Sequence, residues 1–167
     1  MLVAYSASWP LVFEDLRQEL LPVFAGVPVD IAHIGSTSVP GLAAKPVIDL
    51  LLGAPTLAEI ETRIADIMAL AYEYRPHYEA QIPQRRYFVK TIPSGLRIHV
   101  HGVETGGRIW LDHLRFRDLL RTDDTLRVEY EALKQRLAVI HANDKATYTV
   151  EKGVYIQSLL SSLNKQG

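Results

Sequence analysis

HIGSTSVPGLAAKPVID occupies residues 33–49 and lies between two apolar runs of the chain. The segment combines a Gly-Ser step with further hydroxyls, a lysine and an aspartate. Backbone amides at glycine and serine can approach an anion closely, and the lysine supplies positive charge. A carboxylate at the end of an apolar run must be hydrated, paired or metal-bound, because burying it alone is costly. These features predict a site that handles phosphate, with Gly35, Ser36, Thr37, Ser38 and Lys45 as ligand-binding residues.

The residues on both sides of this segment have the pattern of two strands joined by a loop. Residues 29–34 form an apolar run that predicts the first strand, and residues 35–44 contain the loop. Residues 45–52 are apolar on both faces, which is typical of a strand inside a sheet rather than at its edge.

The rest of the chain predicts a hairpin and several helices. Residues 85–92 and 96–103 have the pattern of two strands around a Pro-Ser-Gly turn. Hydroxyl residues at three places have the chemistry of helix N-caps. The sequence therefore predicts an α+β fold, with a small mixed sheet covered by helices and a helical C-terminal third. The expected helices run from Ser8 to Pro22 or Gly26, from Thr56 to Met68, over 110–121, from Thr122 to Ile140, and over 147–163.

The composition is that of one globular domain over residues 1–167, with 48% hydrophobic and 22% charged residues. A net charge of −1 argues against a dedicated nucleic-acid-binding protein but permits a local anion site. The chain has no cysteine, which excludes disulfides, cysteine nucleophiles and thiolate zinc sites. The N-terminus lacks a signal-peptide pattern and no apolar run could span a bilayer, so we expect a cytoplasmic protein without membrane contact.

Two of the expected strands carry side chains that can do chemistry. Because side chains alternate along a strand, His99 and His101 share one face, roughly 6–7 Å apart, and could reach one metal or one phosphate. If their strand neighbours the strand of Asp49, all three side chains converge. Arg86 and Lys152 are expected to add further positive contacts to a phosphate.

Each of these features also has a purely structural interpretation. A loop rich in glycine and serine is often only a turn, a lone aspartate is often a cap, and a His-x-His pair is often a half-buried polar face. His33 alone is typical of a hydrogen-bonded strand histidine, and Arg117 with Arg121 is typical of a solvated helix face. The clustering of polar groups on separated segments favours a site over these alternatives.

Residues 33–49 closely resemble the signature of the GrpB family, an uncharacterised family with a nucleotidyltransferase-like fold. The resemblance continues along nearly the whole chain. It includes an N-terminal aromatic pair, a His-x-His strand, a Phe-Arg-Asp helix and two C-terminal tyrosine–lysine pairs. These motifs match Tyr5 and Trp9, Ile98-His99-Val100-His101, Phe116-Arg117-Asp118, Tyr130 with Lys134, and Tyr148 with Lys152.

The nucleotidyltransferase superfamily, to which this resemblance points, uses a Gly-Ser turn followed by a strand with two acids one residue apart. Its reaction is phosphoryl transfer assisted by two Mg²⁺ ions. Gly35-Ser36 and Asp49 match this pattern, but Leu51 stands where the second acid is expected. One aspartate with two histidines suits Zn²⁺, Mn²⁺, Fe²⁺ or Ni²⁺ better than a pair of Mg²⁺ ions. The resemblance therefore implies an intact phosphate-binding half of the site and an altered metal-binding half.

These observations leave three functions open. The first is a module that binds a nucleotide or other phosphorylated small molecule. The second is a transferase or hydrolase with a single divalent metal (Mn, Zn or Mg) at Asp49, His99 and His101, in which Asp49 and His101 are the catalytic residues. In that second function His101 could also act as a general acid or base, since histidine titrates near neutral pH. The third is a structural role with a vestigial pocket.

Overall fold

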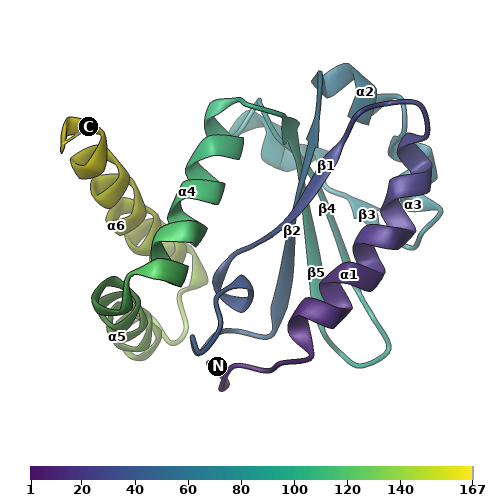
Figure 1. The fold of residues 1–167 in the computed structure, drawn as a ribbon. Helices are drawn as coiled ribbons and strands as arrows, with labels where there is room; N and C mark the ends of the chain where they lie inside the picture. Colours follow the sequence, from purple (N-terminus) through teal and green to yellow (C-terminus); the bar gives the residue numbers. More distant parts are fainter. Residues whose placement is uncertain (167) are drawn as a thin grey trace.

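The computed structural model describes the backbone of residues 1–166 and the side chains of residues 1–164. Its centre is a five-stranded mixed sheet with the strand order β1-β2-β5-β4-β3 (Figure 1). β2 and β5 pair in parallel, and the other neighbouring strands pair antiparallel. The strands are β1 (Asp30–Ile34), β2 (Val47–Ala54), β3 (Glu73–Tyr74), β4 (Arg86–Thr91) and β5 (Arg97–Glu104).

Helices cover both faces of the sheet. α1, α2 and α3 lie on one side, α4 lies on the other, and α5 and α6 stand beyond α4 (Figure 1). The expected α+β fold, with a mixed sheet and a helical C-terminal third, is confirmed. The helices are α1 (Trp9–Leu20), α2 (Leu57–Glu61), α3 (Ile64–Met68), α4 (Arg108–Thr122), α5 (Asp124–Ile140) and α6 (Lys145–Gln166), with short 3₁₀ turns η1 (Leu21–Phe24), η2 (Ser36–Ser38) and η3 (Pro76–Ala80).

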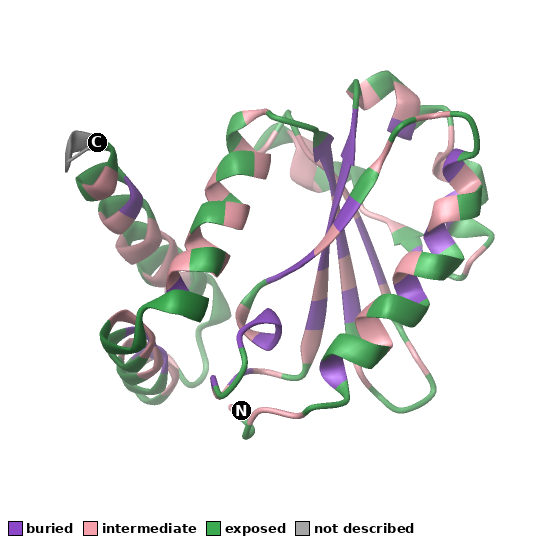
Figure 2. Cartoon of the chain, in the orientation of Figure 1, coloured by how far each residue is buried: buried purple, intermediate pink, exposed green. Residues whose placement is uncertain are grey.

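The alternation of side chains along β2 divides the core into two layers. Leu50 and Leu52 are fully buried in the cluster that includes the apolar residues of α1, α2 and α3. Leu51 packs on the other side with Ile34 and Val103, under α4. Figure 2 shows the buried residues concentrated in the sheet between these helices. Within residues 1–166, no helix combines the length and the apolar character that crossing a membrane requires.

Two expected helix caps differ in the structure. The cap of α5 is Asp123 and not Thr122, because the Asp123 carboxylate accepts a hydrogen bond from the Leu126 amide at 3.0 Å. The Thr122 hydroxyl donates instead to the carbonyl of Asp118, inside α4. Ser8 precedes α1 but makes no capping hydrogen bond with its side chain.

The second strand begins and ends two residues later than the expected 45–52, and the helix after it is broken. Gly53 belongs to β2 rather than to a turn, because it pairs with Asp30 of β1 and Val103 of β5. A Cβ at this position would lie 2.6 Å from the ring of Trp110. The expected helix to Met68 is divided into α2 and α3 at Arg63. The Arg63 guanidinium donates to the carbonyls of Glu59 and Val23 at this break.

Candidate functional site

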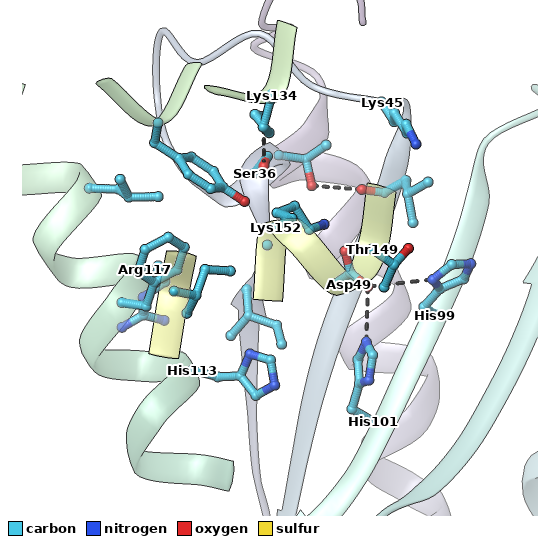
Figure 3. A pocket seen from close by; sticks show the side chains of 18 of the residues that line it. Ser36, Lys45, Asp49, His99, His101, His113, Arg117, Lys134, Thr149 and Lys152 are labelled. Carbon is cyan, nitrogen blue, oxygen red and sulfur yellow. Dashed lines mark hydrogen bonds and ion pairs between the residues drawn. The ribbon is translucent and has the colours of Figure 1, made fainter. Parts of the chain in front are cut away.

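A pocket of about 480 Å³ opens between the α4 face of the sheet and the C-terminal helices. Figure 3 shows side chains from the strands below it and from the surrounding helices converging on one space. The pocket brings together nearly all the site residues expected from the sequence. They are Gly35, Ser36, Thr37, Lys45, Asp49, His99, His101 and Lys152, joined by His113, Arg117, Tyr130, Lys134 and Tyr148.

The parallel pairing of β2 with β5 positions the Asp49 group. Asp49 lies opposite His99 in the strand register, and His101 follows two residues later on the same face. Asp49 Oδ1 lies 2.9 Å from His101 Nε2 and 3.5 Å from His99 Nδ1 (Figure 3). The predicted convergence is confirmed, because one ligand atom from each residue lies within 4.8 Å of the others. The catalytic and metal-binding roles of these residues stay predictions.

Burial and hydrogen bonding set the charges of this group. Burial alone would raise the pKa of Asp49, but hydrogen bonds from His101 and His99 outweigh it and hold that pKa well below its usual range. Burial lowers the pKa of His101, and the positive charge of Arg85 adds to this effect against the opposing pull of Asp49. Near neutral pH the group is therefore a carboxylate that accepts a hydrogen bond from a neutral imidazole.

Gly35 brings the loop directly against this carboxylate. Its φ of +76° lies in the left-handed region that favours glycine. A Cβ at this position would also come within 2.6 Å of Asp49 Oδ2. The turn can therefore approach Asp49 so closely only with glycine at residue 35.

The hydroxyls of the loop have different roles. Thr37 and Ser38 are buried, and they donate to the carbonyls of Val47 and Gly35 respectively. Both hydroxyls thus stabilise the turn, and Ser38 is not part of the pocket wall. Ser36 lies at the start of η2 and faces the pocket (Figure 3). Thr37 also lines the pocket, but its hydroxyl donates to the carbonyl of Val47, whereas the Ser36 hydroxyl accepts a hydrogen bond from Lys134.

Hydrogen bonds from two arginines and a histidine stabilise this turn and the end of the strand before it. His33 is buried, and its Nε2 lies 3.1 Å from the hydroxyl of Thr37, as expected for a satisfied strand histidine. Arg117 donates to the carbonyl of His33 at 3.3 Å, and Arg121 donates to the carbonyl of Ser38 at 2.9 Å. The two arginines therefore join α4 to the end of β1 and to η2, and Arg121 is at the same time exposed, as expected for a solvated helix face.

Lys134 of α5 is the main site residue that the strand motifs did not reveal. It is 2% exposed, and its Nζ donates to Ser36 Oγ at 2.9 Å and to the carbonyl of Ala43 at 2.7 Å. Burial, with repulsion from nearby lysines, lowers the pKa of Lys134 to about 8. The sequence does contain a signal for it: Lys134 stands at helical spacing between Tyr130 and Leu137, on the apolar stripe of the helix.

Lys45 and Lys152 both lie near the aromatic ring of Tyr148. The Lys45 ammonium lies 4.0 Å from the ring centroid of Tyr148, and the Lys152 ammonium lies 5.7 Å from it. Burial lowers the pKa of both lysines, and Lys152 lowers that of Lys45 further. The two expected cations therefore both line the pocket (Figure 3).

Arg86 does not join the pocket. It points to the face of the sheet opposite His101, where its guanidinium contacts Glu61 at 2.7 Å. Arg86 therefore leaves the set of expected ligand-binding residues. The preceding residue takes a position near the site instead, because Arg85 Nη1 lies 3.4 Å from His101 Nδ1.

The Asp49 group has the donor chemistry of a single transition-metal site. Metal bonds of about 2.0–2.2 Å imply about 3–3.5 Å between neighbouring ligand atoms. The two distances from Asp49 Oδ1, 2.9 and 3.5 Å, are of this size. Leu51 is fully buried under α4, so β2 offers no second acid for a pair of Mg²⁺ ions. One carboxylate and two imidazoles suit Zn²⁺, Mn²⁺ or Fe²⁺.

Known proteins resemble this chain over nearly all of its length. A glutamate-rich protein GrpB of Alkalihalophilus pseudofirmus is 34% identical, over 98% of this chain and 95% of its own. A UPF0157 protein of Streptomyces coelicolor is 36% identical, over 94% of this chain and 80% of its own. A dephospho-CoA kinase of Mycolicibacterium paratuberculosis is more distant, with 25% identity over 80% of this chain, and the match spans 38% of that protein.

A solved structure agrees with these sequence matches. The crystal structure of the conserved protein GrpB from Enterococcus faecalis superposes with a TM-score of 0.85 and 30% identity, covering 99% of this chain and 98% of that one. The family model described as GrpB protein matches residues 1–162. The chain therefore belongs to the GrpB protein family.

Proposed function

We propose that this protein binds a nucleotide or another phosphorylated small molecule, with a phosphate group beside Ser36. The observation behind the proposal is the buried ammonium of Lys134, which donates hydrogen bonds to oxygens of Ser36 and Ala43 and lies 5.1 Å from the ring centroid of Tyr130. None of the ion pairs formed within residues 1–164 includes Lys134. Burying such a charge is costly, and a phosphate bound beside it would offset that cost.

The charge balance of the pocket supports the same ligand. Among the described residues, four cationic side chains line the pocket, Lys45, Lys134, Lys152 and Arg117, against the single carboxylate of Asp49. That carboxylate is already engaged by two histidines. Burial and mutual repulsion lower the pKa values of Lys45 and Lys134, and bound phosphate oxygens would reverse this effect.

The order of the elements supports a nucleotidyltransferase-like phosphate site. The Gly-Ser step forms the turn directly after β1, and β2 then carries Asp49 beside it. The partial match to a protein named dephospho-CoA kinase is consistent with a phosphorylated ligand. Fold and resemblance do not establish a reaction, so the proposal concerns binding.

Ligand-induced thermal stabilisation tests this proposal. The melting temperature is measured with inorganic phosphate, pyrophosphate, AMP, ATP, dephospho-CoA and CoA, each with and without a chelator. We expect at least one compound to raise it in the presence of the chelator, since a ligand that binds only the folded state stabilises that state. An unchanged melting temperature across the whole panel would contradict the proposal.

A matched pair of α5 variants locates the binding. Lys134→Met removes the buried ammonium, and we expect it to weaken the best ligand by about tenfold or more, because charge-assisted hydrogen bonds contribute about 1.5–3 kcal/mol. Arg136→Gln removes a positive charge from an exposed position of the same helix and should leave affinity within about twofold. Equal affinities of the two variants would place the ligand elsewhere.

A second candidate function is metal-assisted phosphoryl or nucleotidyl transfer, or hydrolysis, at Asp49, His99 and His101. The convergence of these three ligand atoms within 4.8 Å favours it. A single divalent metal held there would polarise a phosphoryl oxygen or activate water.

Metal analysis of protein purified without a histidine tag tests this second candidate function. Stoichiometric Zn or Mn, lost in Asp49→Ala, would support the metal site, and metal-free protein without turnover in Mn²⁺, Zn²⁺ or Mg²⁺ would rule it out.

A further inference from the structure

The ring nitrogens that face away from Asp49 determine whether the two histidines can hold a metal. A histidine that ligates a metal through one nitrogen donates the N–H of its other nitrogen to a carboxylate, a carbonyl or water. The metal-facing nitrogen must itself be free of a proton. In His99 and His101, the contacts of the ring nitrogen that faces away from Asp49 therefore show whether that nitrogen has an acceptor for its proton.

His101 has a donor where a metal ligand needs an acceptor. Its Nε2 lies 2.9 Å from Asp49 Oδ1, and its Nδ1 lies 3.4 Å from Arg85 Nη1. A guanidinium can only donate, so Nδ1 accepts and the proton of the neutral ring stands on Nε2, toward Asp49. A metal at Nε2 would require that proton to move to Nδ1, where it would face the N–H groups of Arg85.

Arg85 is held in this position by its surroundings. Its guanidinium carbon lies 4.5 Å from the ring centroid of Tyr87, a stacked arrangement that arginine favours. Its backbone amide donates to the carbonyl of Ile82 at 3.1 Å, and β4 begins at the next residue. The contact with His101 is therefore fixed by the start of the strand and by an aromatic face.

His99 has the same difficulty for a different reason. Its Nδ1 lies 3.5 Å from Asp49 Oδ1, which is the direction a shared metal would occupy. Its Nε2 is buried, and no hydrogen-bond partner contacts it among the described residues. If a metal displaced the Nδ1 proton, the N–H at Nε2 would be buried without an acceptor, which is costly.

We propose that Arg85 is a positioning residue that keeps His101 in its Nε2–H tautomer. As a result, Asp49, His99 and His101 form a hydrogen-bonded acid–base group and not a resident metal centre, although their ligand atoms are close enough for one. This inference and the metal-dependent second candidate function exclude each other. The inference does not depend on the phosphate ligand, because it concerns only the contacts among Arg85, Asp49, His99 and His101.

The tautomer and the metal affinity test this inference together. In the full chain without a histidine tag, long-range ¹H–¹⁵N spectra report which nitrogen of His101 carries the proton, and calorimetry reports Zn²⁺ affinity. Arg85→Met removes the donor but keeps aliphatic bulk over Tyr87, and Arg85→Lys keeps a cationic donor. Arg86→Met is the matched control, because the neighbouring arginine points to the other face of the sheet.

We expect the wild type, Arg85→Lys and Arg86→Met to carry the proton on Nε2 and to bind Zn²⁺ weakly. Arg85→Met should bind Zn²⁺ about 10–100-fold more tightly, the usual size of effects from groups that contact metal ligands. A proton on Nδ1 in the wild type would overturn the inference, and so would equal Zn²⁺ affinity in the wild type and Arg85→Met. If Arg85→Met fails to fold, the wild-type spectrum alone decides. Failure of the phosphate panel would leave these readouts unchanged, so the two proposals can fail separately.

Discussion

At the scale of single residues, the contact between Gly35 and Asp49 sets how closely the turn can approach the carboxylate. Gly35→Ala adds a Cβ 2.6 Å from Asp49 Oδ2, at a φ of +76°. With a ψ of −179° as well, residue 35 has a backbone conformation that is almost exclusive to glycine, which costs about 1–3 kcal/mol for a residue with a Cβ, and the clash adds to it. We expect the free energy of unfolding to fall by more than about 2 kcal/mol in urea titrations.

A second glycine of the same loop separates the two causes. Gly41 has a φ of +82° and no atom within 4 Å of an added Cβ. Gly41→Ala should therefore show only the backbone cost, about 1–2 kcal/mol. If Gly35→Ala is no more destabilising than Gly41→Ala, the added Cβ at residue 35 does not clash with the Asp49 carboxylate as the structure predicts.

Because His33 is buried, we expect the free energy of unfolding of the protein to fall in mild acid. Burial lowers its pKa from 6.5 to about 4 in the folded protein. Between these values the unfolded state binds a proton at this residue and the folded state does not, so falling pH favours unfolding. The stability contributed by neutral His33 is present above pH 6.5 and is lost as pH falls to about 4, by roughly 3 kcal/mol in all.

The comparison with His33→Gln isolates this contribution from the other histidines. Urea unfolding at several pH values between about 7 and 4.5 should give a shallower dependence in the variant, by about 1 kcal/mol per pH unit. Because glutamine does not titrate, parallel curves for the two proteins would show that His33 takes up its proton without unfolding.

At the scale of elements, strand register explains why Asp49 and the histidines could be anticipated and Arg86 could not. Alternation along each strand determines which residues share a face, and this holds whichever strand lies alongside. Whether Arg86 or Arg85 lies near the site depends on how β4 pairs with β5, and a one-residue shift reverses every side chain. In the observed register Tyr87 lies opposite His101, so Arg86 faces the other side.

The junction between α4 and α5 gives a prediction at the same scale. Asp123→Ala removes the carboxylate that accepts the Leu126 amide, and should destabilise the protein by about 1 kcal/mol, the usual cost of losing an N-cap. Thr122→Ala removes a hydroxyl bound to a carbonyl inside α4, and should change stability by less than about 0.5 kcal/mol. Urea denaturation of both variants measures this difference. A larger loss of stability in Thr122→Ala than in Asp123→Ala would indicate that Thr122, and not Asp123, caps α5.

At the scale of the whole molecule, the sequence predicted the sheet face of the site better than its helical wall. The fold class and the convergence of Asp49, His99 and His101 follow from local alternation and from the loop after β1. The contact between Lys134 and Ser36 joins residues 98 positions apart, so it depends on how α5 packs over the loop. A lysine on an apolar stripe indicates a buried charge, but only the three-dimensional arrangement identifies its partner.

The packing of α5 and α6 around the pocket predicts that a bound phosphate stabilises the contact between these helices and the sheet. Lys134 connects α5 to Ser36, and the ring of Tyr148 in α6 lies against Lys45, so cations from the loop before β2, α4, α5 and α6 line one pocket. An anion that offsets the repulsion between Lys45 and Lys152 should oppose local opening of α6.

Hydrogen exchange with and without the best ligand of the panel measures this effect. Bound ligand should slow exchange at residues 36–38 and 148–152 much more than in α1. Lys152→Met should lose most of the added protection in α6, whereas Arg136→Gln should keep it. Equal slowing in α1 and α6 would mean that the ligand stabilises the fold as a unit and does not act between these helices and the sheet.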